Sequence, residues 1–150
     1  MRRAASAALA CVVTLFASSR AHAQSFKVSG DPGVMSIQST PNAGTAPTSV
    51  SDATTTYRLT SAQNGGKMIA QLNAPMPAGV TLTIVVSPPP GAQSTGSVNL
   101  DTTPRDVAVG FVNFSGNATK SITYTLTATA AAGVVPLQSR TVTLTIITGP

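Results

Sequence analysis

Few residues of this 150-residue chain have side chains that could do chemistry. The chain has one cysteine and one histidine, Cys11 and His22, and no glutamate. Nucleophilic catalysis by serine or cysteine normally needs a neighbouring base, and a structural zinc ion needs several Cys or His ligands. This inventory predicts a protein that is not an enzyme and needs no cofactor. The acidic residues are Asp31, Asp52, Asp101 and Asp106.

The first 23 residues have the order of segments that is typical of a secretory signal peptide. Two arginines begin the segment, and residues 4–17 form an uncharged, alanine-rich apolar run. Ala21 and Ala23 are the small residues of an A-x-A cleavage site, which places the cut before Gln24. The apolar run is too short to span a bilayer comfortably. We therefore expect residues 1–23 to be removed during export.

Cys11 supports a second interpretation of this segment, because a cysteine in a signal peptide can carry the lipid of a bacterial lipoprotein. Leu9 lies one position nearer to the cysteine than that signal prefers, so simple cleavage is favoured. Cleavage would remove both Cys11 and His22, and the remaining six basic residues and four aspartates give a net charge of about +2. So small a charge, with no basic stripe, does not indicate binding to nucleic acid.

Two aspartates lie close enough in the sequence to be considered as a metal site. Asp101 and Asp106 are five positions apart, with Arg105 beside the second. Surface loops of β-sandwiches can bind calcium, but calcium takes six to eight oxygen ligands. The two residues are therefore weak calcium candidates. The simpler interpretation of Asp101 is a turn in which its carboxylate accepts backbone hydrogen bonds.

The aromatic residues divide into expected core residues and one candidate contact. Tyr57 and Tyr124 lie within apolar alternations, which indicates core positions. Phe111 and Phe114 are three apart and would face opposite ways on a strand. Phe114 lies next to a polar, glycine-containing loop, and we expect it to be the exposed one and a contact point for a partner.

Alternation of apolar and polar residues predicts β-strands over most of the remaining chain. In residues 80–86 the apolar side chains fall two apart, which places them on one face of a strand. The threonines between apolar residues suit the pleat and tolerate water on the other face. We expect strands in 26–29, 34–38, 55–60, 67–72, 80–86, 97–100, 106–112, 120–129 and 142–146.

Short strands separated by turn residues are typical of an all-β sandwich or barrel. We expect an immunoglobulin-like antiparallel sandwich of about 7–9 strands in residues 55–150, preceded by a cleaved signal helix. Residues 24–54 are expected to be an N-terminal arm and a Ser/Thr/Pro-rich loop. The turn residues at 64–66 predict a hairpin between the flanking strands.

The closing stretch, residues 139–150, is expected to pair with residues 121–129 of its own chain. Arg140 before this strand and the Gly-Pro pair after it are residues that discourage pairing of an exposed edge with another chain.

Residues 67–146 resemble a group of small secreted bacterial proteins of unassigned function. The similarity is carried by the stretches "MIAQLNAPMPAGVTLTIVV", "SVNLDTTPRDVAVGF" and "SITYTLTATAAAGVVPLQSRTVTLTI". The resemblance covers about 80 residues and implies an immunoglobulin-like β-domain exported by a Gram-negative bacterium. It brings no catalytic residues with it.

Three arrangements are open to these strands: a self-contained sandwich, a pilus-type subunit completed by a neighbour's strand, and an outer-membrane barrel. The lack of disulfides and of a terminal aromatic residue favours the first. We expect an exported structural or adhesion component, in the periplasm, at the cell surface or outside the cell, with no membrane span after leader cleavage. Its partners would be copies of itself or other surface proteins that join through sheet edges. The alternative is a secreted ligand-binding module, for example for a glycan.

Overall fold

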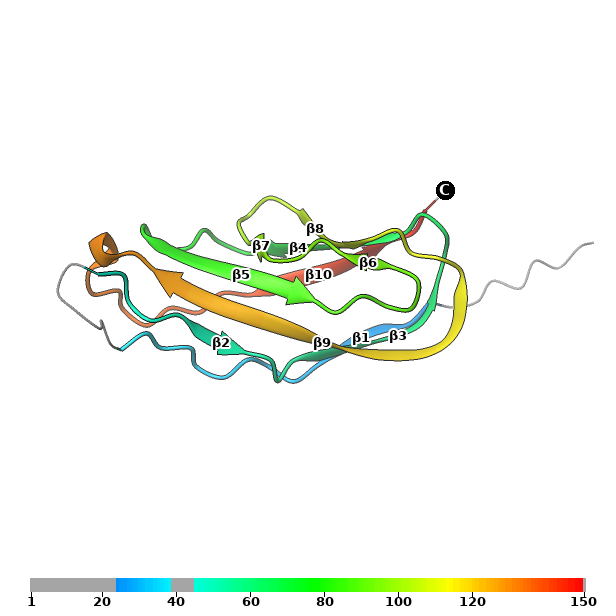
Figure 1. The fold of residues 1–150 in the computed structure, drawn as a ribbon, viewed down its shortest axis with the longest axis horizontal. Coiled ribbons are helices and arrows are strands. Elements are labelled where there is room, and N and C mark those ends of the chain that lie inside the picture. The colour runs from blue at the N-terminus through cyan, green and yellow to red at the C-terminus, as the bar shows by residue number, and fades with distance from the viewer. Residues whose placement is uncertain (1–23, 39–44, 150) are drawn as a thin grey trace, which may run out of the picture.

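The computed structural model describes residues 24–38 and 45–149, which form two antiparallel β-sheets packed face to face (Figure 1). The expected signal peptide and its cleavage residues Ala21 and Ala23 lie outside the described residues, as does Cys11. The elements are β1 (Phe26–Ser29), β2 (Val50–Asp52), β3 (Thr56–Ala62), β4 (Lys67–Leu72), β5 (Val80–Val86), β6 (Gln93–Ser94), β7 (Val98–Asn99), β8 (Arg105–Val109), β9 (Phe114–Ala128), the 3-10 turn η1 (Ala130–Ala132) and β10 (Val142–Ile147).

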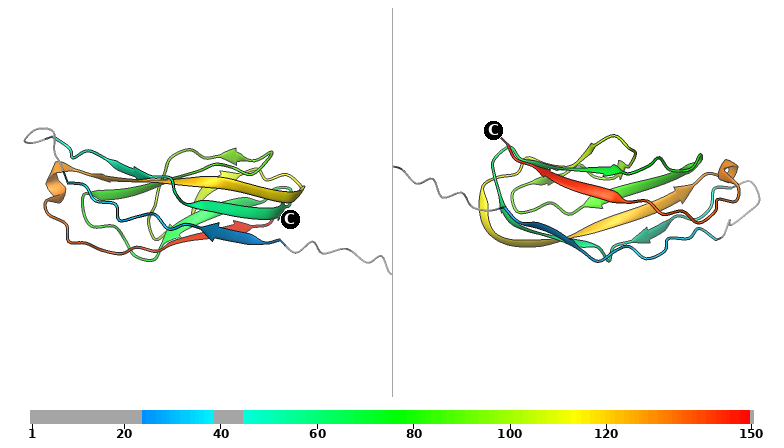
Figure 2. Two further views of the ribbon diagram at one scale, coloured as in Figure 1. Left: turned by 90° about the horizontal axis from the view of Figure 1, so that it is seen from below. Right: turned by 180° about the vertical axis from the view of Figure 1, so that it is seen from behind.

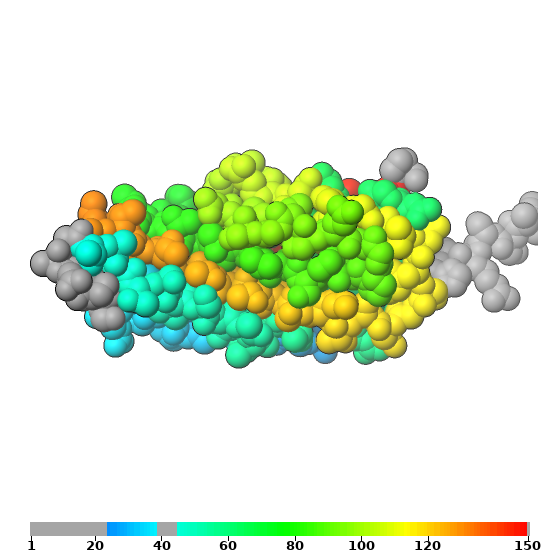
Figure 3. All heavy atoms as spheres, viewed as in Figure 1, coloured from blue at the N-terminus to red at the C-terminus, as the bar shows by residue number. Residues whose placement is uncertain are grey.

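The first sheet has the order β1-β3-β9-β5-β7 and is organised around the 15-residue strand β9. The first half of β9 pairs with β3, from Ala62 opposite Phe114 to Thr56 opposite Ser121. Its second half lies between β5 and the short strand β2. In Figure 3, β9 crosses the molecule diagonally between β5 and β2.

The second sheet has the order β10-β4-β8-β6. Strand β10 runs antiparallel to β4 in an unbroken register, from Val142 opposite Leu72 to Ile147 opposite Lys67. The pairing of β4 with β8 has an irregularity between Met68 and Ile69. These pairings make β10 and β6 the edges of this sheet.

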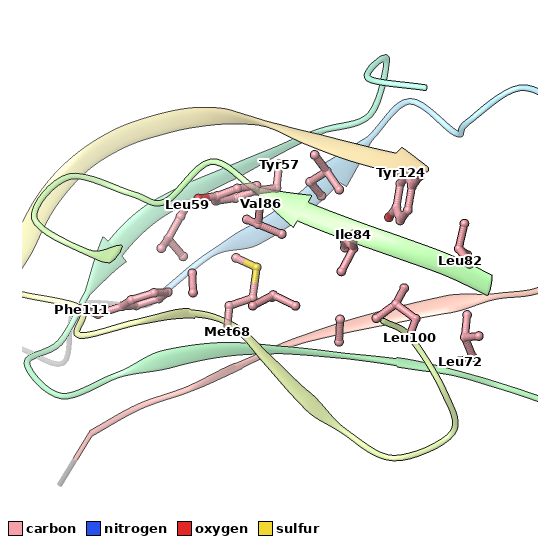
Figure 4. Packing of buried hydrophobic residues seen from close by; sticks show 14 of the residues in the cluster. Tyr57, Leu59, Met68, Leu72, Leu82, Ile84, Val86, Leu100, Phe111 and Tyr124 are labelled. Atoms are coloured by element: carbon pink, nitrogen blue, oxygen red, sulfur yellow. The ribbon is translucent and has the colours of Figure 1, made fainter. Parts of the chain in front are cut away.

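The core lies between the sheets and follows from the period of two in the sequence. In β4 every second residue is buried, and the same alternation runs over residues 56–59 in β3 and 81–86 in β5, because alternate side chains of a strand point to the same face. Figure 4 shows the two inner faces meeting, with Tyr57 and Ile84 on one sheet and Met68 on the other. Tyr57 and Tyr124 are both buried, which confirms their expected core positions.

The structure is nearly all β, as expected, but two expected pairings were wrong. Strands β3 and β4 do not form a hairpin, since they lie in different sheets. Gly65, with a φ of 73°, and the buried Gly66 carry the chain across from one sheet to the other. The closing strand β10 pairs with β4 and not with residues 121–129. Alternation marks a strand with one buried face, but it does not say which strand lies beside it.

The connection after β3 is held by reciprocal hydrogen bonds from a loop far away in the sequence. The backbone N–H of Asn64 donates to Asn113 Oδ1 (2.9 Å), and that of Asn113 donates to Asn64 Oδ1 (2.8 Å). Gly65 and Gly66 bond through their backbones to Phe111. The connection is therefore fixed by these long-range hydrogen bonds, and not by the bonds between neighbouring strands that a hairpin would have.

Three smaller expectations also changed. Residues 34–38 form no strand, and β2 lies inside the segment expected to be a loop. Strand β9 begins at Phe114, several residues before the expected start, so the polar stretch around it is part of a strand. No helix among the residues with described structure is long and apolar enough to cross a membrane.

Thr55 is a buried polar residue that offers a test of the packing. Its side chain is 1% exposed, and its Oγ1 has no hydrogen-bond partner among the described residues. Valine has nearly the same shape, and an unpaired buried hydroxyl costs free energy. We expect Thr55→Val to raise the free energy of unfolding by about 1 kcal/mol, measured by urea denaturation.

The matched control is Thr60→Val. Thr60 Oγ1 accepts a hydrogen bond from the backbone N–H of Ser25 (2.9 Å), so this variant should lose stability. A Thr55→Val protein that unfolds at lower urea than the wild type would contradict this account of the buried hydroxyl.

Candidate binding side of the sandwich

One side of the sandwich carries one edge of each sheet. Strand β1 is the outer strand of the first sheet and β10 is the outer strand of the second. Their neighbours β3 and β4 both contribute to the common core, and Figure 2 shows β1 and β10 together in the view from behind. An edge strand presents unpaired backbone N–H and C=O groups, which can pair with another chain.

The register of β10 decides which of its backbone groups face outward. The backbone N–H of Asn73 donates to the carbonyl of Thr141 (3.0 Å), and the N–H of Thr141 donates to Asn73 Oδ1 (2.9 Å). Hydrogen-bonded and non-hydrogen-bonded pairs alternate along an antiparallel ladder. Residues 143, 145 and 147 therefore bond to β4, and the backbone groups of Val142, Leu144 and Ile146 point away from it.

An open groove of about 1150 Å³ lies beside these edges, next to the end of β9. Its walls include residues 32–38, which continue from β1, and residues 133–140, which lead into β10. Its floor includes Leu82 and Leu126 from the first sheet. The walls expose large apolar side chains: Val34 is 81% exposed, Leu137 is 85% exposed and Val134 is fully exposed. Exposed apolar residues gathered in one region are typical of a binding surface.

The floor of the groove also carries the hydroxyl of Tyr124. Tyr124 is 4% exposed and lines the groove, and its hydroxyl has no hydrogen bond among the described residues. By contrast, the hydroxyl of Tyr57 donates to the carbonyl of Ser87 (2.7 Å). Burial, with a smaller contribution from the charge of Asp31, raises the pKa of Tyr124 to about 12. The hydroxyl therefore stays protonated at neutral pH and can donate a hydrogen bond to a ligand.

Arg140 lies at the groove, and its hydrogen bonds to other described residues all go to neutral oxygen atoms. Its guanidinium donates to the backbone carbonyls of Pro75 (2.9 Å) and Ser139 (2.8 Å), and to Gln138 Oε1 (2.5 Å). These bonds hold the segment before β10 against the loop after β4. Arg140 lies before β10, and the strand itself, from Val142 to Ile147, contains no charged residue.

The two calcium candidates are each paired with a cation. Asp101 accepts a hydrogen bond from Arg105 (2.5 Å), and this contact, together with the backbone N–H of Thr103, lowers the pKa of Asp101. Asp106 forms an ion pair with Lys67 (2.9 Å). The described part of the chain holds no group of three or more His, Cys, Asp or Glu residues that could ligate a metal.

The structure places Phe114 partly in the core. Its side chain is half-buried and packs against the buried cluster, while Phe111 is fully inside it.

Gln24, the expected first residue after cleavage, is at the start of the described chain. Its side-chain Nε2 donates a hydrogen bond to the carbonyl of Ser61 (3.2 Å).

Sequence reasoning missed the groove. The sequence signal for the groove was the presence of large apolar residues in a loop. Val134 and Leu137 lie in the connection before β10, which the strand pattern marks only as a turn region. Comparisons with protein-family models, curated proteins and solved structures return no match to this chain, so its groove and edges have to be interpreted from their own chemistry.

Proposed function

We propose that this protein is an exported, non-enzymatic β-sandwich that works as a structural or adhesion component at the bacterial cell surface or in its surroundings. The leader pattern at residues 1–23 supports export. The lack of Cys, His and Glu in residues 24–150 supports a role without catalysis. The resemblance of residues 67–146 to small secreted β-domains agrees with both.

The observation that carries the proposal is the pair of unpaired edges, β1 and β10, on one side of the sandwich. Main-chain hydrogen bonds to an added strand supply affinity without any special side chain, and neighbouring apolar pockets supply selectivity. Here the groove and its exposed valines and leucine lie next to the edges. A surface with these properties suits attachment to another polypeptide.

Cell fractionation tests this proposal directly. The native cells would be separated into cytoplasm, periplasm, outer membrane, surface shear fraction and medium, and each fraction probed with an antibody. We expect the protein in the surface fraction or the medium, in species larger than the monomer and shortened at Gln24. A full-length protein in the cytoplasm, or a strict monomer confined to the soluble periplasm, would contradict it.

The alternative function is a secreted ligand-binding module, and the groove-lining hydroxyl of Tyr124, which has no hydrogen bond among the described residues, favours it. A donor in an apolar groove is how many ligand sites fix the orientation of a bound molecule. Asp101, Asp106 and Phe114 do not line this groove: the two aspartates are paired with cations and Phe114 is half-buried. A glycan array with wild type and Tyr124→Phe tests it: binding that the variant loses supports this function, and no binding above background removes it.

A further inference from the structure

We infer that β10 is a self-association edge, and that two copies of this chain join through antiparallel pairing of β10 with β10 around Leu144. This inference identifies the contact through which the proposed structural component would assemble. Only the biological role of the contact rests on the proposed function. It stands on three observations: the contrast between β10 and the other edges, the direction of its free backbone groups, and the self-complementary pattern of its side chains.

The first observation is that β10 alone lacks the features that normally protect an edge. Sheet edges are usually very short, charged or interrupted by a bulge. In the described sheets, β6 and β7 are two residues long, and β2 is three residues long and includes Asp52. Strand β1 has four residues and includes Lys27. Strand β10 has six residues, no charge and no break in register.

The second observation is that the free backbone groups of β10 fit a twofold axis. With Leu144 opposite Leu144 of a second copy, each leucine N–H meets the other's carbonyl. The same register places Val142 opposite Ile146 of the second copy, and the reverse. These are the three residues whose backbone groups point away from β4, so the pairing satisfies all of them at once.

The third observation is the pattern of side chains along the joint. The side chains of Val142, Leu144 and Ile146 are half-buried against the core, and those of Thr143 and Thr145 are exposed on the outer face. In this register Thr143 lies opposite Thr145 of the second copy. Paired threonines on neighbouring strands are favourable, and no like charges meet across the joint.

The joint is small, and this sets the conditions of the test. A strand pair of six residues lies at the low end of specific interfaces, so association is expected at high protein concentration. The measurement is sedimentation equilibrium of residues 24–150, from about 10 µM to about 1 mM, in low salt so that added charges are not screened.

Two charge variants at exposed positions give a matched pair. Thr143→Lys with Thr145→Lys places like charges opposite each other twice and should raise the dimer dissociation constant by at least about tenfold. Thr143→Lys with Thr145→Glu places opposite charges at the same two contacts and should keep or strengthen the dimer. Both variants should keep the wild-type thermal transition of the monomer, because the two side chains are exposed.

Amide hydrogen exchange identifies the joint at residue level. Raising the concentration should slow exchange at Val142, Leu144 and Ile146, whose N–H groups are free in the monomer. Exchange at Thr143 and Thr145 should change little, because β4 already pairs with them. This alternation between neighbouring residues would not arise from association through another surface.

A wild type that stays monomeric up to about 1 mM, or two charge variants that associate equally, would overturn the inference. These failures are distinct from failure of the proposed function. A surface protein that assembles through β1 or through a different partner would still be found in the surface fraction, whereas its β10 variants would behave as the wild type does.

Discussion

Replacement of Phe111 by alanine is expected to lower the free energy of unfolding by about 3–5 kcal/mol, because it leaves a large cavity in a core that cannot collapse locally. Phe111 is 2% exposed. Its backbone is tied at both ends to the connection between the sheets, since its N–H donates to the carbonyl of Gly66 (3.0 Å) and its carbonyl accepts from Gly65 (2.9 Å). Urea denaturation followed by circular dichroism measures the change.

Phe114→Ala is the matched control for this prediction. Phe114 is half-buried at the start of β9, so its truncation removes less apolar contact and should cost about 1–2 kcal/mol. A Phe111→Ala protein at least as stable as Phe114→Ala would contradict the greater burial of Phe111 in the core.

The individual strands could be predicted because the alternation of apolar and polar residues within each segment shows which side chains are buried. Residues 67–72 were predicted with the bounds of β4, and residues 80–86 with those of β5. In each case alternate side chains face the core, and the period of two is visible within a single segment. The coarse fold class follows from many such segments and few helix signals.

The pairing of strands could not be predicted in the same way. The glycines after β3 fit a hairpin turn, but their conformation here depends on Asn113 and Phe111, about 50 residues further along the chain. The pairing of β10 with β4 likewise depends on how the whole second sheet assembles. Contacts between distant segments leave no mark on the periodicity of either one.

The candidate site was accessible from the sequence only in part. Arg140 and the Gly-Pro pair around β10 predicted an exposed edge that they would protect, whereas the structure shows the Arg140 guanidinium bonded to Pro75, Ser139 and Gln138. Each of the two calcium candidates is paired with a cation, Asp101 with Arg105 and Asp106 with Lys67, and sequence spacing alone did not indicate the second pair. The groove depends on how residues 32–38 and 133–140 are brought together, which is a property of the whole sandwich.

The second large effect is expected at alkaline pH, where the two buried tyrosines should destabilise the fold together. Burial raises the pKa of Tyr57 above the ordinary tyrosine value of 10.0 and raises that of Tyr124 to about 12. The stabilisation from such a raised pKa is fully present below pH 10 and is lost as the pH rises through 12. Tyr124 alone accounts for at most about 3 kcal/mol.

Tyrosinate absorbance provides the measurement, because the chain has two tyrosines and no tryptophan. In the folded protein neither tyrosine should ionise near pH 10, and both should ionise in one step as the protein unfolds at higher pH. A gradual titration around pH 10 with the fold intact would contradict this prediction.

Phenylalanine variants separate the contributions of the two tyrosines. Tyr124→Phe removes a hydroxyl that makes no hydrogen bond within the described parts of the chain, so it should change stability little at pH 7 and reduce the loss of stability between pH 10 and 12. Tyr57→Phe should also reduce the alkaline loss, but at pH 7 it should cost about 1 kcal/mol because it breaks the bond to the carbonyl of Ser87. This difference at neutral pH distinguishes the hydroxyl that supports the fold from the one that the groove leaves available to a ligand.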